Sequence, residues 1–176
     1  MQIQLYIGVS GCGKTTRIQQ TYLNRASMCL YVPGNVDYFP RTLIQVEHES
    51  IALAGSYQEM PTRGKLVSGT DCFRRDYGAQ HIVRYVVDEP DCADLLVMEG
   101  YKIYSVQLMK KLRELGVDMQ VTHFKCPQHV AYRRLVERGD PPHLHVHEQK
   151  YRIAEGFAQW CKDFGLPVTE VATWHQ

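Results

Sequence analysis

The fold is decided by one stretch near the start of the sequence, Gly8-Val9-Ser10-Gly11-Cys12-Gly13-Lys14-Thr15. It has the form G-x-x-x-x-G-K-T, which is the pattern of a loop that binds phosphate groups. Glycines let such a loop curl until successive backbone N–H groups point inward at phosphate oxygens. A helix that starts at the lysine adds the positive end of its dipole. The pattern therefore predicts a binding site for a nucleoside triphosphate.

Two side chains of this stretch have expected tasks of their own. The ammonium of Lys14 would reach the β- and γ-phosphates, and the hydroxyl of Thr15 would be a ligand of Mg²⁺. We therefore expect ATP and Mg²⁺ to bind here. The expected nucleotide-binding residues are Gly8, Ser10, Gly11, Cys12, Gly13, Lys14, Thr15 and Thr16.

The residues on both sides of the loop fit this interpretation. Ile3, Leu5 and Ile7 alternate with polar or amphipathic neighbours, which predicts a strand that ends at the loop. No glycine or proline interrupts residues 14–26, so a helix is expected after it. A strand before and a helix after are the context that a phosphate-binding loop requires. The alternative is a glycine-rich turn before an ordinary helix.

Strands and helices alternate along the rest of the chain. Short apolar runs predict strands over 29–32, 43–46, 51–54, 95–98, 121–126 and 168–172, the second and third forming a hairpin around His48. Helical spacing predicts helices around 79–86, 108–115, 128–138 and 153–164, the first capped by Thr70 or Asp71. This order predicts an α/β fold, a parallel sheet flanked by helices, in a single domain over residues 1–176. With the loop, the expected class is a P-loop NTPase fold.

Composition narrows the class of protein and its compartment. The formal net charge is +1, so no strong overall field attracts a nucleic acid or a membrane surface. No apolar run is long enough to cross a bilayer, and the start of the chain lacks the features of a secretory signal. The six cysteines are scattered without a CxxC pair, which favours reduced thiols in the cytoplasm.

Three acidic residues are candidates for the chemistry. Glu99 follows the apolar run 95–98 directly, which is where a carboxylate would help to hold Mg²⁺; the alternative is a strand that merely ends in Glu. Asp37 and Asp71 are candidates for the general base that takes the proton of an acceptor hydroxyl. The alternatives are a solvated turn residue for Asp37 and a helix N-cap for Asp71.

Two arginines and three histidines mark the region before the last helix. Arg134 and Arg138 are four residues apart on one predicted helix, before a lid loop near 139–148, and could stabilise the transferred phosphoryl charge. The alternative is a pair of surface arginines near Glu137. The motif His143-Leu-His-Val-His147 would place three rings on one face of a strand, but the flanking prolines and the lack of further ligands argue against a metal site.

The middle of the chain resembles a particular group of enzymes. Leu53-Ala-Gly-Ser-Tyr57, Gly69-Thr-Asp71, Val97-Met-Glu-Gly100 and Lys150 follow one another in the order of the bacteriophage hydroxymethyl-deoxyuridine DNA kinases. More broadly the chain is similar to P-loop nucleoside and nucleotide kinases. The resemblance implies an ATP-dependent kinase whose acceptor is the hydroxymethyl group of hydroxymethyluracil in DNA. It also implies the cytoplasm of a bacterial host if the chain is phage-encoded.

Two other functions remain open at this point. A kinase of free nucleosides or nucleoside monophosphates would use the same loop, and a P-loop switch module would bind and slowly hydrolyse a nucleotide. DNA would need a local basic surface, because phosphate neutralisation dominates affinity for nucleic acids. The candidate clusters are Arg63 with Lys65, Arg74 with Arg75, and Lys102 with Lys110 and Lys111.

Overall fold

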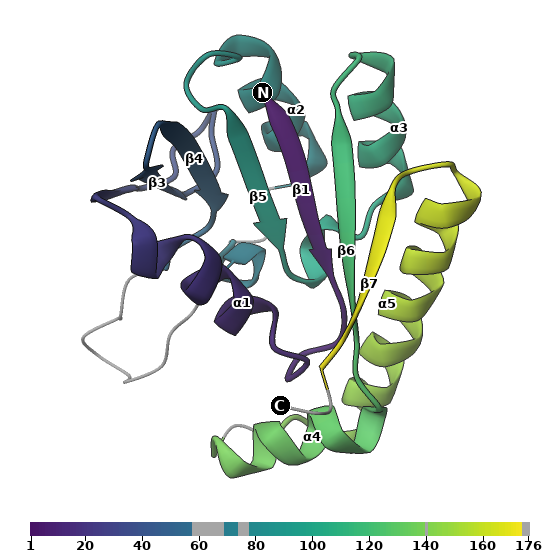
Figure 1. The fold of residues 1–176 in the computed structure, drawn as a ribbon. Helices are drawn as coiled ribbons and strands as arrows, with labels where there is room; N and C mark the ends of the chain where they lie inside the picture. The colour runs from purple at the N-terminus through teal and green to yellow at the C-terminus, as the bar shows by residue number, and fades with distance from the viewer. Residues whose placement is uncertain (58–68, 74–77, 140, 174–176) are drawn as a thin grey trace.

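The strands form one mostly parallel sheet. The computed structural model describes residues 1–57, 69–73, 78–139 and 141–173, without the side chains of Asp71 and Cys72. The described part has an α/β fold with helices on both faces of a mostly parallel sheet, which confirms the expected α/β architecture (Figure 1). The strand order is β2-β3-β4-β5-β1-β6-β7. The strands are β1 (Gln2–Ile7), β2 (Met28–Val32), β3 (Arg41–Val46), β4 (Glu49–Ala54), β5 (Leu95–Glu99), β6 (Met119–Lys125) and β7 (Val168–Ala172).

One strand departs from the expected parallel arrangement. β3 runs antiparallel to both β2 and β4, whereas β4, β5, β1, β6 and β7 pair in parallel. Between β3 and β4 stand only Glu47, whose φ is 56°, and His48. Such a short turn reverses the chain, because a parallel pair needs a long crossover. The hairpin expected around His48 is confirmed, and the sheet is mixed at this edge.

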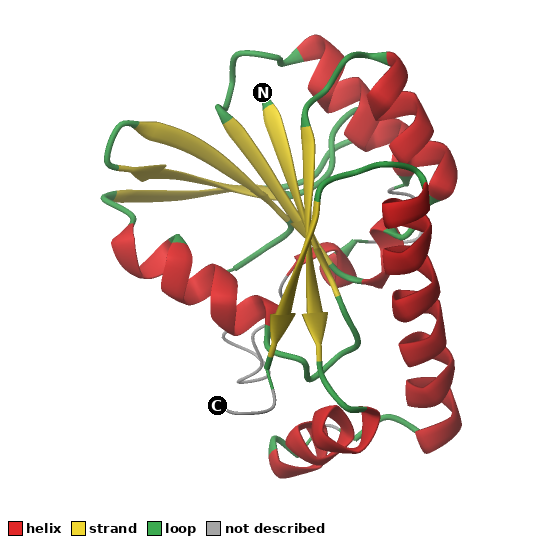
Figure 2. Ribbon diagram, turned by 45° about the vertical axis from the view of Figure 1, so that its right-hand side comes forward, coloured by secondary structure: helices red, strands yellow, loops and turns green. Residues whose placement is uncertain are grey.

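The helices divide unequally between the two faces. They are α1 (Lys14–Thr21), α2 (Ala79–Asp88), α3 (Val106–Glu114), α4 (Gln128–Glu137) and α5 (Leu144–Asp163), with 3₁₀ turns η1 (Leu23–Arg25), η2 (Gly69–Cys72) and η3 (Tyr101–Ile103). Residues of α2, α3 and α5 join one core cluster, and residues of α1 and α4 join the other (Figure 2). Alternate residues of β1 supply them, Leu5 to the first and Tyr6 to the second. None of the described helices has the length and apolar character needed to span a bilayer.

Three predicted boundaries are wrong. The helix expected over 14–26 ends at Thr21 and gives way to η1. The helix expected to be capped by Thr70 or Asp71 begins at Ala79, after Gly78, because Thr70 and Asp71 belong to η2 and the Thr70 hydroxyl donates to the Glu99 carbonyl instead. The lid loop expected near 139–148 is shorter, because α5 already begins at Leu144.

The sheet sets the position of the candidate site. In parallel strands all carboxyl ends lie at one edge, and loops at that edge bind ligands in α/β proteins. β1 lies between β5 and β6, with Tyr6 in register with Glu99 and Ile7 in register with His123. The end of β1 therefore delivers residues 8–15 next to the end of β5. We call residues 8–15 the glycine loop.

Candidate functional site

The glycine loop is packed tightly between β6 and α4. Gly11 has φ +88°, and a Cβ at this position would lie 2.3 Å from the carbonyl oxygen of Ala131 on α4. Only glycine can therefore occupy this place without displacing the α4 backbone. The close approach of Gly11 to α4 fixes one side of the loop, and α1 begins at its other end with Lys14.

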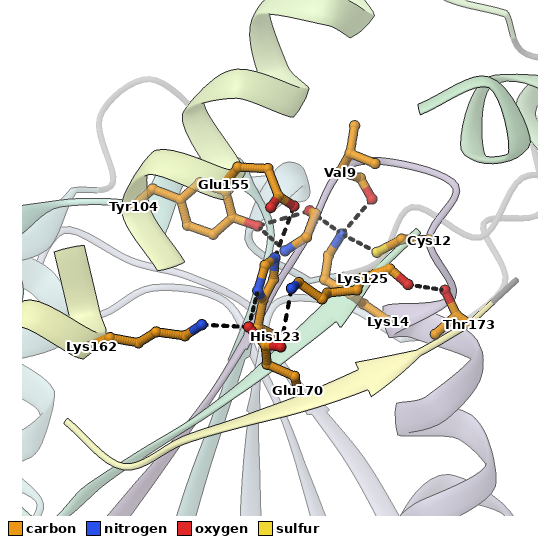
Figure 3. A network of polar contacts seen from close by, with 11 residues as sticks. Val9, Cys12, Lys14, Tyr104, His123, Lys125, Glu155, Lys162, Glu170 and Thr173 are labelled. Atoms are coloured by element: carbon orange, nitrogen blue, oxygen red, sulfur yellow. Dashed lines mark hydrogen bonds and ion pairs between the residues drawn. The ribbon is translucent and has the colours of Figure 1, made fainter. Parts of the chain in front are cut away.

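The ammonium of Lys14 lies inside the glycine loop. Lys14 is 9% exposed, and its Nζ donates to the carbonyl oxygens of Gly8 at 2.7 Å and Val9 at 3.0 Å (Figure 3). The Nζ of Lys14 also lies 3.6 Å from the sulfur of Cys12. Cys12 is fully buried, and this burial raises the pKa of its thiol despite the nearby ammonium. The loop thus holds one buried positive charge and a neutral thiol.

A buried carboxylate lies beside the start of α1. Glu99 is 3% exposed, and its Oε1 accepts hydrogen bonds from the hydroxyl of Thr15 at 2.8 Å and from the hydroxyl of Tyr57 at 3.2 Å. A buried carboxylate is costly unless it is hydrogen-bonded, and these two hydroxyls offset that cost. The structure therefore brings together Thr15 and Glu99, the two residues that the sequence predicts as metal ligands.

The turn η2 covers Glu99 from the other side. The hydroxyl of Thr70 donates to the Glu99 carbonyl at 2.7 Å. Gly69 has φ +63°, and a Cβ there would lie 2.5 Å from Cγ of Glu99. The Gly69-Thr-Asp71 segment is thus in direct contact with the candidate metal residue, although the carboxylate of Asp71 lies outside the described part of the structure.

The sequence did not indicate that Tyr104 and His147 hold the glycine loop. The hydroxyl of Tyr104 accepts from the backbone N–H of Gly8 and donates to its carbonyl, both at 2.9 Å (Figure 3). His147 is fully buried on α5, and its Nε2 donates to the Ser10 carbonyl at 3.3 Å. Both contacts are tertiary, so no spacing in the sequence indicates them. His147 is therefore a support of the loop.

The three histidines of 143–147 do not assemble as a strand would place them. His143 precedes α5 and stacks on His145 with ring centroids 5.7 Å apart, whereas the ring of His147 contacts Tyr132 and Ser10. Within the described residues no group of three or more His, Cys, Asp or Glu side chains could hold a metal ion.

Asp37 lies in the β2–β3 connection, away from the centre of the sheet. Its carboxylate pairs with Arg84 of α2 at 2.6 Å, and both side chains are half exposed. The contacts described for the Asp37 carboxylate do not include Glu99 or the glycine loop. Asp37 follows β2 at the edge of the sheet where parallel strands end, as expected. However, β3 and β4 separate β2 from β5, which carries Glu99.

The two arginines at the C-terminal end of α4 have different surroundings. Arg134 donates to the carbonyl oxygen of Thr173, after β7, at 2.6 Å. Arg138 follows the last residue of α4 and is exposed. Because Ala131 of the same helix touches Gly11, both arginines stand on an element that packs on the loop.

A polar network ties α5 to β6 and β7 beside the loop (Figure 3). His123 on β6 is buried, and its Nε2 lies 3.0 Å from a carboxylate oxygen of Glu155 on α5. Glu170 on β7 pairs with Lys125 at 3.1 Å and with Lys162. Hydrogen bonds from these two lysines lower the pKa of Glu170 to about 2. The network fixes α5, the helix that carries His147, against the sheet.

Chemically, this site can hold a polyphosphate. It offers a buried ammonium, a curled loop at a helix N-terminus, and a hydroxyl–carboxylate pair made of hard oxygen ligands. Comparisons with models of protein families and with curated proteins each gave no match.

Proposed function

We propose that this protein is an ATP- and Mg²⁺-dependent kinase that transfers the γ-phosphoryl group to a hydroxyl of a nucleotide-type acceptor. One observation carries the proposal. The Thr15 hydroxyl lies 2.8 Å from the buried Glu99 carboxylate, directly beside the loop that encloses the Lys14 ammonium. A polyphosphate needs a cation and loop amides, and its metal needs oxygen ligands within reach; this arrangement supplies all of them.

The donor set fits Mg²⁺. Mg²⁺ prefers oxygen ligands, uses only one or two protein groups, and completes its coordination with phosphates and water. Thr15 and Glu99 are such a pair of oxygen ligands. When bound, Mg²⁺ would neutralise charge on the phosphate oxygens. Thr15 and Glu99 would hold it, and Tyr57 would orient the carboxylate.

The chain's own residues account for the rest of the transfer. Lys14 exchanges the carbonyls of Gly8 and Val9 for the β- and γ-phosphates, which are stronger partners of an ammonium. The acceptor oxygen attacks the γ-phosphorus, the bond between that phosphorus and the β–γ bridging oxygen breaks, and ADP leaves. Arg134 and Arg138 remain the proposed arginines that approach the transferred group from α4.

Of the two candidate bases, the geometry favours Asp71. Its backbone belongs to η2, whose residues Gly69 and Thr70 lie against Glu99. Asp37 is already paired with Arg84 beyond β4. In this proposal Asp71 takes the proton from the acceptor hydroxyl as the new oxygen–phosphorus bond forms.

The proposed acceptor is the hydroxymethyl group of hydroxymethyluracil in DNA, and free nucleosides or nucleoside monophosphates are the alternative. The basic clusters that would bind DNA are only partly described. Lys102 donates to the carbonyl of Phe73, and Lys111 pairs with Glu114 at 3.1 Å, so two of the three lysines in that cluster already have protein partners. The clusters Arg63/Lys65 and Arg74/Arg75 lie outside the described residues.

An acceptor panel tests the proposal. ADP release from ATP should be slow alone and should rise at least about 100-fold with the correct acceptor, because positioning and electrostatic stabilisation both require it. The panel contains DNA with hydroxymethyluracil, the same DNA with thymine, free hydroxymethyldeoxyuridine and nucleoside monophosphates. Labelled phosphate in the free nucleosides or monophosphates alone would decide for the alternative acceptor. Slow hydrolysis that no acceptor stimulates would indicate the switch module instead and contradict the kinase.

Replacing Asp71 with asparagine should lower kcat for transfer about 100-fold and leave ATP affinity nearly unchanged, because a general base acts on the chemical step and not on nucleotide binding. Asp37→Asn is the matched control and should lose little activity, since its partner is Arg84. Steady-state kinetics with nucleotide titration measures both variants. A large loss in Asp37→Asn with normal Asp71→Asn would reverse the assignment.

A further inference from the structure

One face of α5 passes from the glycine loop to the end of β5. His147, near the start of the helix, donates to the Ser10 carbonyl. Three turns further, Phe157 stacks on Tyr104, with ring centroids 5.2 Å apart, and Tyr104 binds Gly8. Residues three or four apart share a helix face, so Lys150 lies on the same side as His147. Lys150 therefore stands between the residues that bind the loop.

The ammonium of Lys150 is directed at Tyr101. Its Nζ lies 5.8 Å from the centre of the Tyr101 ring, and this is the contact described for it. Tyr101 comes two residues after Glu99 and begins η3, so its position is set by the end of β5. The ring is 39% exposed. The cation thus lies over a ring of η3, two residues along the chain from the carboxylate that would hold the metal.

We propose that Lys150 contacts the γ-phosphate and stabilises the charge of the phosphoryl group during transfer. The inference rests on the proposed function and adds a catalytic residue to it. A cation at 5.8 Å from a ring centre is weakly held, and a phosphate oxygen is a much stronger partner for an ammonium. Lys150 can therefore leave Tyr101 when a triphosphate fills the loop. Its four-carbon stem gives the reach for this movement.

The other cations near the loop have different tasks. Lys14 lies deep in the loop and is committed to the β- and γ-phosphates in the proposed mechanism. Arg134 donates to the Thr173 carbonyl after β7, and in the proposed function it approaches the transferred group with Arg138 from α4. Lys150 instead lies over Tyr101 of η3, the turn that follows Glu99 at the end of β5. In the proposal this charge reaches the transferred phosphoryl group from the end of β5.

The test compares Lys150→Met with Arg152→Met. Both variants lose one positive charge from α5, but Arg152 is exposed and two residues further along the helix. We expect Lys150→Met to lower kcat for transfer about 100-fold, the size of effect seen when one charge-stabilising group is removed from a transition state. Affinity for ADP should change less than about threefold, and Arg152→Met should behave as the unchanged protein.

A second readout does not depend on the acceptor. The complex of ADP with aluminium fluoride imitates the transferred phosphoryl group, so Lys150→Met should weaken its binding far more than it weakens binding of ADP alone. Equal loss for both ligands, or near-normal kcat in Lys150→Met, would overturn the role of Lys150 while the kinase stands. Failure of the unchanged protein to bind ADP would overturn the proposed function itself, and the role of Lys150 with it.

Discussion

Lys14→Ala should lower phosphoryl transfer about 1000-fold and abolish tight binding of ATP. The reason is that the Lys14 ammonium is the cation that the glycine loop encloses, and a charge preorganised in a water-poor site contributes strongly to transition-state stabilisation. Isothermal titration with ATP and a transfer assay measure the two effects. Lys14→Arg should also be impaired, because a planar guanidinium cannot replace a compact ammonium within a loop that Lys14 nearly fills.

Loss of folding must be separated from loss of binding in these variants. Removing Lys14 leaves the carbonyls of Gly8 and Val9 without this donor, so a modest fall in thermal stability is expected. Arg152→Ala, at an exposed position on α5, is the control for the change in net charge. A folded Lys14→Ala protein that transfers phosphate at a near-normal rate would refute the assignment of the glycine loop.

Glu99→Gln should raise the Mg²⁺ concentration needed for half-maximal activity by about tenfold or more, because loss of a carboxylate around a metal typically costs that much in affinity. The amide keeps the size of the side chain and can still accept from Thr15 and Tyr57, so the fold should survive. Titration of MgADP against ADP without metal gives a readout independent of turnover. The variant should bind both about equally.

The matched control for Glu99 is Tyr57→Phe. It removes one donor to the carboxylate and keeps the charge, so it should shift the Mg²⁺ requirement in the same direction but less. An unchanged Mg²⁺ requirement in Glu99→Gln would show that Glu99 only braces Thr15 and the turn η2. The metal would then need another ligand.

The order of strands and helices could be predicted from sequence because each element carries its own period. Ile3, Leu5 and Ile7 alternate along β1, and the apolar run 95–98 precedes Glu99 in β5. The neighbourhood of Thr15 and Glu99 follows from the motif together with the rule that parallel strands end at one edge. The antiparallel direction of β3 relative to β4 can also be predicted locally, because the turn that joins them is only two residues long.

The remaining contacts of the site could not be predicted, because they join residues distant in sequence through the packed fold. Tyr104 reaches Gly8 only because η3 and α5 set its ring against Phe157. His147 sits in a motif that suggests a metal ligand, yet its place in a helix aims it at Ser10. Threonine is a common helix cap, but the Thr70 hydroxyl donates to the Glu99 carbonyl instead. A buried backbone carbonyl without a hydrogen-bond donor would be costly.

The central position of β1 has a consequence for how the chain folds. β2, β3 and β4 pair with neighbours in sequence and form hairpins, which need little loop closure. β1 pairs with β5 and β6, where Gln2 is in register with Leu95 and Ile3 with Met119. It can therefore pair only after segments far along the chain are available. During synthesis the apolar strand β1 leaves the ribosome long before either partner. The glycine loop at its end therefore takes shape late, and under the proposed function a nascent chain would gain affinity for nucleotide only once β6 has emerged and closed the centre of the sheet.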